Sequence, residues 1–228
     1  MEEQPIKGIK MAIATETRTT LKKNLIDYED SINHLYLDTK GKVTVGIGHL
    51  IANKNAMSGV TLYKVKNKLL TQPATLQDKM TEYASIAKLP WGKRYGTKSF
   101  EKHTTLRMKE FDINNLLNKH IDNFYRELKN IYKKDKGFTK NFDDFDSKVQ
   151  LALFDMIFNL GATKLVNSFP KFNEAIKSGD FEKAAIQSHR LDVHEDRNKH
   201  VQKLFEDAST GVIVGVPIGK INQAEAQV

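Results

Sequence analysis

Two carboxyl groups and one hydroxyl group in the segment 29–49 have the types and spacing needed to hydrolyse a glycosidic bond. Asp38 follows Glu29 by nine residues, and Thr44 comes six residues after Asp38. Glycoside hydrolysis uses one protonated carboxyl group as the proton donor and one ionised carboxylate that activates water or stabilises the transition state. Glu29 suits the acid role if apolar neighbours surround it, because burial favours the protonated form of a carboxyl group. Asp38 suits the ionised role beside a turn, where water and backbone donors are available.

A helix and a hairpin are predicted to position these groups. Hydroxyl N-cap candidates at positions 19 and 20 precede apolar residues at helical spacing, which predicts a short amphipathic helix that ends near residue 30. The β-prone runs 34–38 and 42–48 flank a turn in which Gly41 can take a positive φ, and they predict a small hairpin. Without such a framework, two acids at this spacing would be interpreted as solvated surface residues.

Residues 58–89 are predicted to form two helices. Leu62, Val65 and Leu69 have the spacing of one helical stripe. Residues 75–78 resemble a capping box, which opens the second helix.

The C-terminal half is predicted to be helical as well. Residues 111–132 hold one apolar face over a length that could bridge two lobes, and residues 147–160 are apolar on most sides, as in a core helix. Gly161 is expected to end that core helix. Asp155 and Asn159 within it are expected to be buried and hydrogen-bonded rather than catalytic. Shorter helices are predicted over three further ranges: 170–178, 181–191 and 196–208.

The ordered pattern around the carboxyl pair is more specific than the pair alone. At matching spacing, it resembles the motif of the phage-type lysozymes in these residues: Glu29, Asp38-Thr39, Gly41, Thr44 and Gly46-Ile47-Gly48-His49. Residues 151–161 look like the buried central helix of that family, and residues 196–201 look like the start of its closing helix. The resemblance covers roughly residues 19–55 and 107–208, and it leaves residues 56–106 as an insertion.

The resemblance implies a mainly α, α+β fold with two lobes. A small β-hairpin lobe and a larger helical lobe would be joined by a long helix, with the substrate cleft between them. In the family's pattern Glu29 is the general acid, Asp38 is the second carboxylate, and Thr44 helps to hold the attacking water. His49 resembles a position that pairs structurally with a carboxylate, and Arg197 resembles an arginine that orients the catalytic glutamate. Family members of this kind are usually inverting and use neither a metal nor an organic cofactor.

The basic insertion 56–106 is the main departure from the family. Residues 51–100 carry nine Lys or Arg against two Asp or Glu, which places nearly all of the net charge of +8 there. We expect Trp91, Arg94 and Tyr95 to contact substrate, because aromatic faces stack on sugars and basic groups attract an anionic glycan. The alternative is a solvated basic surface in which Trp91 only anchors the packing.

Composition excludes several function classes. The 228 residues include no cysteine, which excludes disulfide scaffolds, thiol catalysis and cysteine-based metal sites. With 36 Lys and Arg against 28 Asp and Glu, an anionic partner is expected: nucleic acid, an acidic membrane surface or an acidic polysaccharide. We expect no nucleic-acid binding, because no module motif is present, and no stable membrane insertion; the lysozyme-like motif favours peptidoglycan. His189, His194 and His200 do not share the face that one metal site would need.

The sequence predicts an N-terminal arm over residues 1–18, a lysozyme-like catalytic domain over 19–208 and a C-terminal tail over 209–228. We expect a monomeric muramidase that cleaves the β-1,4 bond between N-acetylmuramic acid and N-acetylglucosamine. A lytic transglycosylase and a non-catalytic wall-binding protein of the same fold are the alternatives. With no recognisable signal peptide, the protein is expected to be made in the cytoplasm and to reach peptidoglycan as a phage endolysin or as an injected antibacterial effector with an immunity partner.

Overall fold

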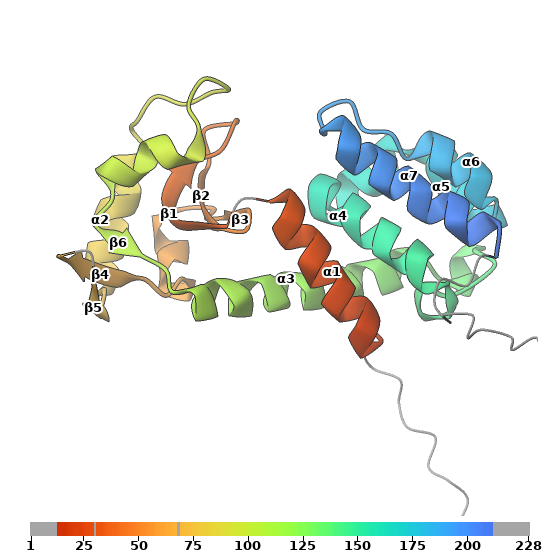
Figure 1. The fold of residues 1–228 in the computed structure, drawn as a ribbon, viewed down its shortest axis with the longest axis horizontal. Coiled ribbons are helices and arrows are strands. Elements are labelled where there is room, and N and C mark those ends of the chain that lie inside the picture. Colours follow the sequence, from red (N-terminus) through yellow and green to blue (C-terminus); the bar gives the residue numbers. More distant parts are fainter. Residues whose placement is uncertain (1–12, 30, 68, 212–228) are drawn as a thin grey trace, which may run out of the picture. The chain divides into compact units, whose positions relative to one another are not determined.

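The computed structural model describes residues 13–29, 31–67 and 69–211 (Figure 1). The chain divides into two compact units, Met1–Glu127 (unit 1) and Leu128–Val228 (unit 2). The described chain is mainly helical and contains two small antiparallel sheets, so the predicted mainly α, α+β class is confirmed. Most of the predicted arm and tail lies outside the described residues.

The first helix, α1 (Thr15–Tyr28), begins earlier than predicted. Its N-cap residue is Ala14, which makes no side-chain hydrogen bond to the helix. Thr17, Leu21 and Leu25 are its buried residues, and they recur at every fourth position on one face. Packing of this face, rather than a hydroxyl cap, therefore accounts for the earlier start.

The predicted hairpin is present as part of a three-stranded antiparallel sheet in the order β1-β2-β3. Its strands are β1 (Ile32–Leu37), β2 (Val43–Gly46) and β3 (His49–Leu50). Gly41 takes the predicted positive φ, +72°, in the turn between β1 and β2. A side chain would be strained in this backbone conformation, which explains the glycine.

The segment 58–89 opens with strands rather than with the predicted helix. A second antiparallel sheet has the order β5-β4-β6, with β4 (Tyr63–Lys66), β5 (Leu69–Pro73) and β6 (Leu106–Arg107). The predicted stripe was wrong because its members do not share a buried face: Leu62 is buried and Leu69 is exposed. Pairing of β4 with β6, a distant segment of the chain, stabilises the strand and cannot be seen in local periodicity.

The second helix predicted in this segment is α2 (Leu76–Ile86). Its capping box is present, because the Thr75 hydroxyl accepts the Asp78 backbone N–H and the Asp78 carboxylate accepts the Thr75 backbone N–H. Two of its buried residues are polar, Lys79 and Glu82. Part of the inward face of α2 is therefore polar.

Two 3₁₀ helices complete this region: η1 (Lys54–Gly59), which begins two residues before the insertion, and η2 (Thr97–His103) within it. Strand β1 of the hairpin contacts η2, α2 and β6. One such contact joins His34 Nε2 and the carbonyl oxygen of Thr97 at 3.2 Å. The insertion therefore packs onto the hairpin.

The long helix predicted after the insertion is α3 (Glu110–Ile131). Leu117 and Ile121 on its predicted apolar face are buried. Arg18 of α1 forms an ion pair with Asp122 of α3 at 2.6 Å. The boundary between the two units falls within the last turns of α3.

The described residues of unit 2 form helices and connecting loops, with no strand among them. After the end of α3 the unit contains η3 (Lys134–Lys136), η4 (Phe142–Asp144), α4 (Ser147–Ser168), α5 (Pro170–Ser178), α6 (Phe181–Gln187) and α7 (Glu195–Ser209). α7 packs against α4 and α6. The ring of Phe172 in α5 contacts the ring of Phe205 in α7, with a distance of 5.5 Å between their centroids. α6 ends earlier than the predicted range 181–191.

The core helix α4 is interrupted at Gly161, whose φ is +72°, at the predicted position. Asp155 is buried as predicted, whereas Asn159 is exposed, which contradicts the prediction. Asn159 lies beyond the buried run of this helix, in the turn before the interruption. By length and composition alone α4 could cross a membrane, but 56% of its apolar window is buried inside the protein, as in a core helix.

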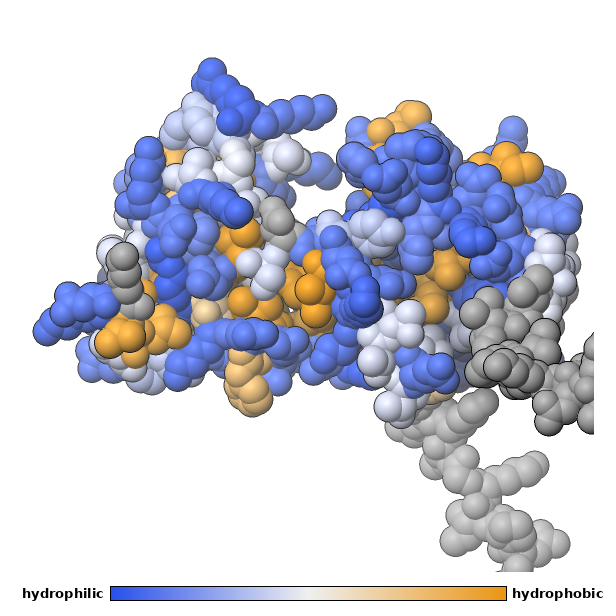
Figure 2. Space-filling view, in the orientation of Figure 1, coloured by the Kyte–Doolittle hydropathy of each residue, from blue (hydrophilic) through white to orange (hydrophobic). Residues whose placement is uncertain are grey.

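Hydrophilic side chains cover most of the face of each unit that Figure 2 shows. An apolar group lies over β4 and β5 in that view. Leu69 and Leu70 of β5 are 69% and 39% exposed. Scattered exposed apolar residues of this kind are normal on a folded protein.

Candidate active site

Glu29 is the C-cap residue of α1, where the chain leaves the helix. Its backbone N–H donates to the carbonyl of Leu25 at 3.0 Å, and its own conformation is extended. Glu29 continues the four-residue spacing of Leu21 and Leu25, and it is half-buried. It lines a cavity of about 460 Å³ together with Ile26, Asp27, Tyr28, Ser31, Tyr36 and Thr97. The helix end thus presents the predicted acid at a cavity.

Asp38 directly follows β1 and closes the hairpin turn. Its backbone N–H donates to the carbonyl of Lys42 at 3.0 Å, and the N–H of Gly41 donates to the carbonyl of Asp38 at 3.0 Å. Its carboxylate Oδ1 accepts the backbone N–H groups of Lys40 and Lys42, each at 2.8 Å. These bonds orient the carboxylate, and they also give Asp38 a structural part in the turn.

Thr44 is buried in β2, and its hydroxyl donates to the carbonyl of Lys42 at 3.0 Å. The backbone of Lys42 therefore links Thr44 to Asp38, whose carboxylate accepts the Lys42 N–H. Tyr36 lies directly opposite Thr44 in the ladder and two residues before Asp38, so the three side chains share one face of the sheet. Tyr36 also lines the Glu29 cavity. The sheet face of Asp38 and Thr44 thus adjoins the cavity of Glu29.

Trp91 covers the hairpin turn. A Cβ built at Gly41 would lie 2.6 Å from Trp91 Cε2 and 2.7 Å from Trp91 Nε1, so the indole rests against the backbone of the turn that carries Asp38. The residue nevertheless remains 53% exposed. Trp91 therefore packs against the turn, while both its contact with substrate and the alternative of a purely packing role stay predictions.

Arg94 and Tyr95 lie against each other. The guanidinium carbon of Arg94 is 4.9 Å from the centroid of the Tyr95 ring, a cation–π distance. Tyr95 also lines a cavity of about 270 Å³ with Leu89, Pro90, Ser99, Phe100, Lys102 and His103. Contact of this pair with substrate stays a prediction.

His49 pairs with a histidine where the resemblance implied a carboxylate, so that expectation was wrong. His49 Nδ1 lies 2.9 Å from Nε2 of His120, because α3 presents an imidazole at this position. Burial, with the neighbouring charges of His120 and Lys119, lowers the pKa of His49 to about 4. Burial also lowers the pKa of His120. In a neutral pair one ring nitrogen can donate to the other.

In unit 2, Arg190 and Arg197 both bind the buried carboxylate of Asp155. Arg190 Nη1 lies 2.7 Å from Asp155 Oδ1, and Arg197 Nε lies 2.9 Å from Asp155 Oδ2. The side-chain oxygen of Asn198 accepts the backbone N–H of Arg190 at 3.2 Å and extends the network. Asp155 is thus hydrogen-bonded as predicted. A role of Arg197 in orienting Glu29 stays a prediction.

Tyr36, Thr97 and His120 belong to this region and were missed by sequence reasoning. Tyr36 was identifiable, because it lies two residues before Asp38 in a predicted strand and therefore on the same face. Thr97 and His120 come from η2 and α3, and nothing in the sequence pairs them with the hairpin.

Metal chemistry has no obvious site in the described part of the chain. No group of three or more His, Asp or Glu side chains there is arranged to hold a metal ion. His189 and His194 instead lie near the exposed carboxylates of Glu195 and Asp196, at 3.2 and 3.5 Å.

The arrangement in unit 1 can support acid-assisted bond cleavage with a nearby oriented carboxylate. A half-buried carboxyl group at a cavity can donate a proton. A carboxylate held by backbone donors can stabilise positive charge that develops in a transition state, or can take a proton from water. The buried hydroxyl of Thr44 has one preferred orientation, since it donates to a backbone carbonyl.

Comparison with models of known families finds no match for this chain, and comparison with curated proteins finds no significant match. The functional assignment is therefore built on residue types, their spacing and their geometry.

Proposed function

We propose that this protein is a peptidoglycan hydrolase of the muramidase type, which cleaves the β-1,4 bond between N-acetylmuramic acid and N-acetylglucosamine. The observation that carries the proposal is the shared sheet face of Asp38 and Thr44, which adjoins the cavity lined by Glu29. The order and spacing of these three residues, similar to those of the phage-type lysozymes, support the same function.

In the proposed reaction Glu29 donates its proton to the glycosidic oxygen as the bond from that oxygen to the anomeric carbon breaks. A water molecule attacks the anomeric carbon from the opposite face of the sugar and forms the new C–O bond. The Asp38 carboxylate takes a proton from this water, and the Thr44 hydroxyl helps to hold it. The released sugar carries a free reducing end with inverted configuration.

Trp91 is proposed to stack on a sugar ring next to Asp38. Its indole rests on the Gly41 turn and about half of the residue stays exposed, so it is both fixed and accessible. Aromatic faces of this kind combine large contact area with little loss of conformational freedom.

The direct test is the substitution Glu29→Gln, assayed by release of reducing ends from purified cell walls. We expect release to be abolished and the thermal unfolding midpoint to be unchanged, because Gln keeps the shape of the side chain but cannot donate a carboxyl proton. Glu16→Gln is the matched control, since Glu16 is an exposed residue in the first turn of the same helix. Wild-type release by Glu29→Gln would refute the proposal.

Mass spectrometry of the released muropeptides distinguishes hydrolysis from the related eliminative reaction. A lytic transglycosylase needs only the acid and leaves 1,6-anhydro ends, whereas a hydrolase leaves free reducing ends. Asp38 and Thr44 favour the hydrolase, because both serve to place water. Wall binding without any release would instead indicate a non-catalytic wall-binding protein.

A further inference from the structure

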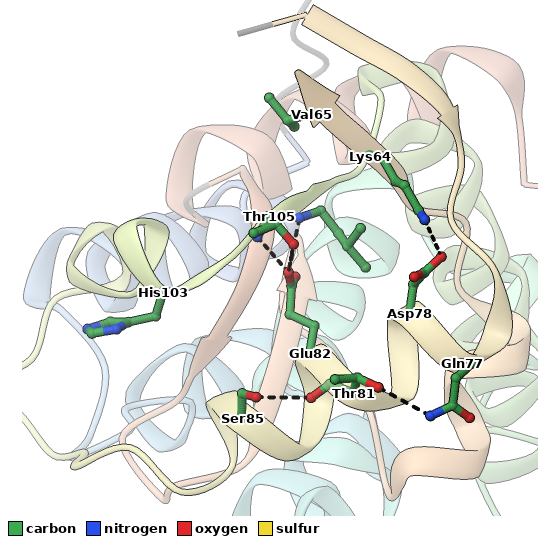
Figure 3. A pocket seen from close by; sticks show the side chains of 10 residues that line it. Lys64, Val65, Gln77, Asp78, Thr81, Glu82, Ser85, His103 and Thr105 are labelled. Carbon is green, nitrogen blue, oxygen red and sulfur yellow. Dashed lines mark hydrogen bonds and ion pairs between the residues drawn. The ribbon is translucent and has the colours of Figure 1, made fainter. Parts of the chain in front are cut away.

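A second cavity, of about 430 Å³, lies within unit 1 between α2, β4 and β6 (Figure 3). Its lining residues are Lys64, Val65, Gln77, Asp78, Thr81, Glu82, Ser85, His103, Thr105 and Leu106. In Figure 3, Glu82 reaches from α2 toward Thr105, with the Lys64 and Asp78 pair to one side and His103 to the other. This cavity belongs to the insertion 56–106 and shares no lining residue with the cavity of Glu29.

The two carboxylate oxygens of Glu82 have different surroundings. Oε2 accepts the backbone N–H of Thr105 at 2.6 Å, the backbone N–H of Leu106 at 3.0 Å and the Thr105 hydroxyl at 3.0 Å. Oε1 is buried and has no hydrogen-bond partner within the part of the chain that the structure describes. The whole residue is only 7% exposed. An acceptor buried without a donor pays its full desolvation penalty, which a donor from a ligand would relieve.

Burial raises the pKa of Glu82, while its hydrogen bonds to Thr105 and Leu106 and the charge of Arg107 act in the opposite direction. Because these effects oppose each other, a further charge nearby would shift the balance between the protonated and ionised forms of this carboxyl group. A cation entering the cavity would favour the ionised form and gain from it.

The nearby cations of the protein already have partners. Lys64 Nζ forms an ion pair with Asp78 Oδ2 at 2.9 Å. Arg107 Nη1 donates to the Thr104 hydroxyl at 2.7 Å, and Arg107 Nη2 lies 3.3 Å from the carboxylate of Glu101. A hydrogen-bond donor for Glu82 Oε1 therefore has to come from a group other than Lys64 and Arg107.

We infer that this cavity binds a primary ammonium group at the end of an aliphatic chain, with an ammonium N–H donating to Glu82 Oε1. Hydrogen bonds between two charged groups are stronger than neutral ones. Val65 and Leu106 offer apolar contact for the methylene groups of such a chain. The hydroxyl groups of Thr81 and Ser85, which are exposed residues of α2, offer further acceptors at the rim.

The source of the ammonium group is assigned to a lysine-containing stem peptide of peptidoglycan, because the lysine side chain ends in such a group. This assignment rests on the proposed function. The insertion that forms the cavity also carries Trp91, which contacts the turn of Asp38. One inserted segment would then bind the peptide while the hairpin binds the glycan strand.

The test measures binding by isothermal titration calorimetry with a sugar-free tripeptide, Ala-γGlu-Lys, and with the same peptide acetylated on the lysine side chain. We expect the free ammonium to bind about tenfold or more tightly than the acetylated form. Equal dissociation constants would overturn the inference, whatever the fate of any variant. Because the probes contain no glycosidic bond, this result is independent of whether the protein proves to be a muramidase.

Two substitutions in the cavity and one outside it locate the binding. Glu82→Gln removes the charge, and Ser85→Lys places a competing ammonium three residues from Glu82 on the same helix face. Both should abolish the preference for the free ammonium, and Glu16→Gln, which changes an exposed acid of α1 outside the cavity, should keep it. Persistence of the preference in both cavity variants overturns the site. Binding of 1,5-diaminopentane as tight as that of the tripeptide overturns the assignment to a peptide.

Discussion

Replacing Gly41 with alanine tests whether the insertion holds the catalytic hairpin through Trp91. Gly41 has φ +72°, where an alanine is unfavourable by about 1–2 kcal/mol from conformation alone. Its new Cβ would also meet the Trp91 indole at 2.6 Å, so the indole has to move away. Gly48 has φ +67° with no heavy atom within 4 Å of the same position. Gly48→Ala is therefore a control that has the conformational penalty without the contact.

The size of the effect follows from the burial of Trp91. The residue is 53% exposed, so about half of its surface is at stake in this contact. A tryptophan side chain buries up to about 200 Å² when fully covered, which leaves roughly 100 Å² here. At about 25 cal/mol per Å², displacing the indole costs up to about 2.5 kcal/mol. We expect Gly41→Ala to lower the free energy of unfolding by about 2–4 kcal/mol and Gly48→Ala by about 1–2 kcal/mol.

Urea unfolding followed by circular dichroism measures these differences in five proteins: the wild type, Gly41→Ala, Gly48→Ala, Trp91→Ala and the double variant Gly41→Ala/Trp91→Ala. Because Gly41→Ala and Trp91→Ala remove the same contact, the double variant should be less destabilised than their sum by about 1–2 kcal/mol. Trp91 is the single tryptophan of the chain, so its fluorescence reports directly on this contact. The emission maximum should move to longer wavelength in Gly41→Ala and stay in place in Gly48→Ala.

Two results would refute this reasoning. One is an equal loss of stability in Gly41→Ala and Gly48→Ala, which would mean that the indole contributes nothing at the turn. The other is additivity of Gly41→Ala and Trp91→Ala within about 0.5 kcal/mol. If Gly41→Ala lowers muropeptide release more than Gly48→Ala does, the contact between Trp91 and the turn also helps to position Asp38.

Two further predictions concern Asp38 and His49. Asp38→Asn keeps an oxygen that accepts the N–H groups of Lys40 and Lys42, so we expect a free energy of unfolding within about 0.5 kcal/mol of the wild type but no release of reducing ends. Asp38→Ala should lower the free energy of unfolding and should also abolish release. Full activity in Asp38→Asn would show that the residue serves the turn alone. The pKa of His49 is lowered from 6.5 to about 4, so the unfolded chain binds more protons in this range, and the stability present above pH 6.5 is lost as the pH falls toward 4. We expect the resulting loss of stability to be about 1–2 kcal/mol, because His49 is only partly buried. His49→Gln should flatten the dependence of stability on pH over this window relative to His194→Gln, an exposed control, and an unchanged slope in His49→Gln would contradict the assignment.

Elements with local signals were predictable from the sequence. The hairpin was found because its two strands and the turn at Gly41 lie within a short stretch of chain. The capping box at Thr75 and the interruption at Gly161 were found for the same reason. The helix predicted from the stripe at Leu62 and Leu69 was wrong, because this segment forms strands and β4 pairs with β6, which comes after α2 in the chain.

Within the candidate site, the sequence predicted what the strand period determines and missed what packing determines. Asp38 and Thr44 share a face because of their positions in the hairpin, which alternation alone predicts. The His49 and His120 pair depends on how α3 packs beside the first sheet, and the Trp91 contact depends on how the insertion folds back. Neither contact has a signal at fixed spacing, so neither was predictable in detail.

The insertion packs against the hairpin, and these contacts determine which experiments can test the function of the insertion. Trp91 covers the Asp38 turn, Thr97 lines the cavity of Glu29, and the carbonyl of Thr97 meets His34 of β1. Deleting the insertion would remove η2, α2 and the first residue of β6, elements that contact β1, and would expose buried apolar side chains of β1 to water. Lost activity in such a deletion would follow from unfolding of the hairpin alone, so point substitutions within the folded chain are the appropriate test of what the insertion binds.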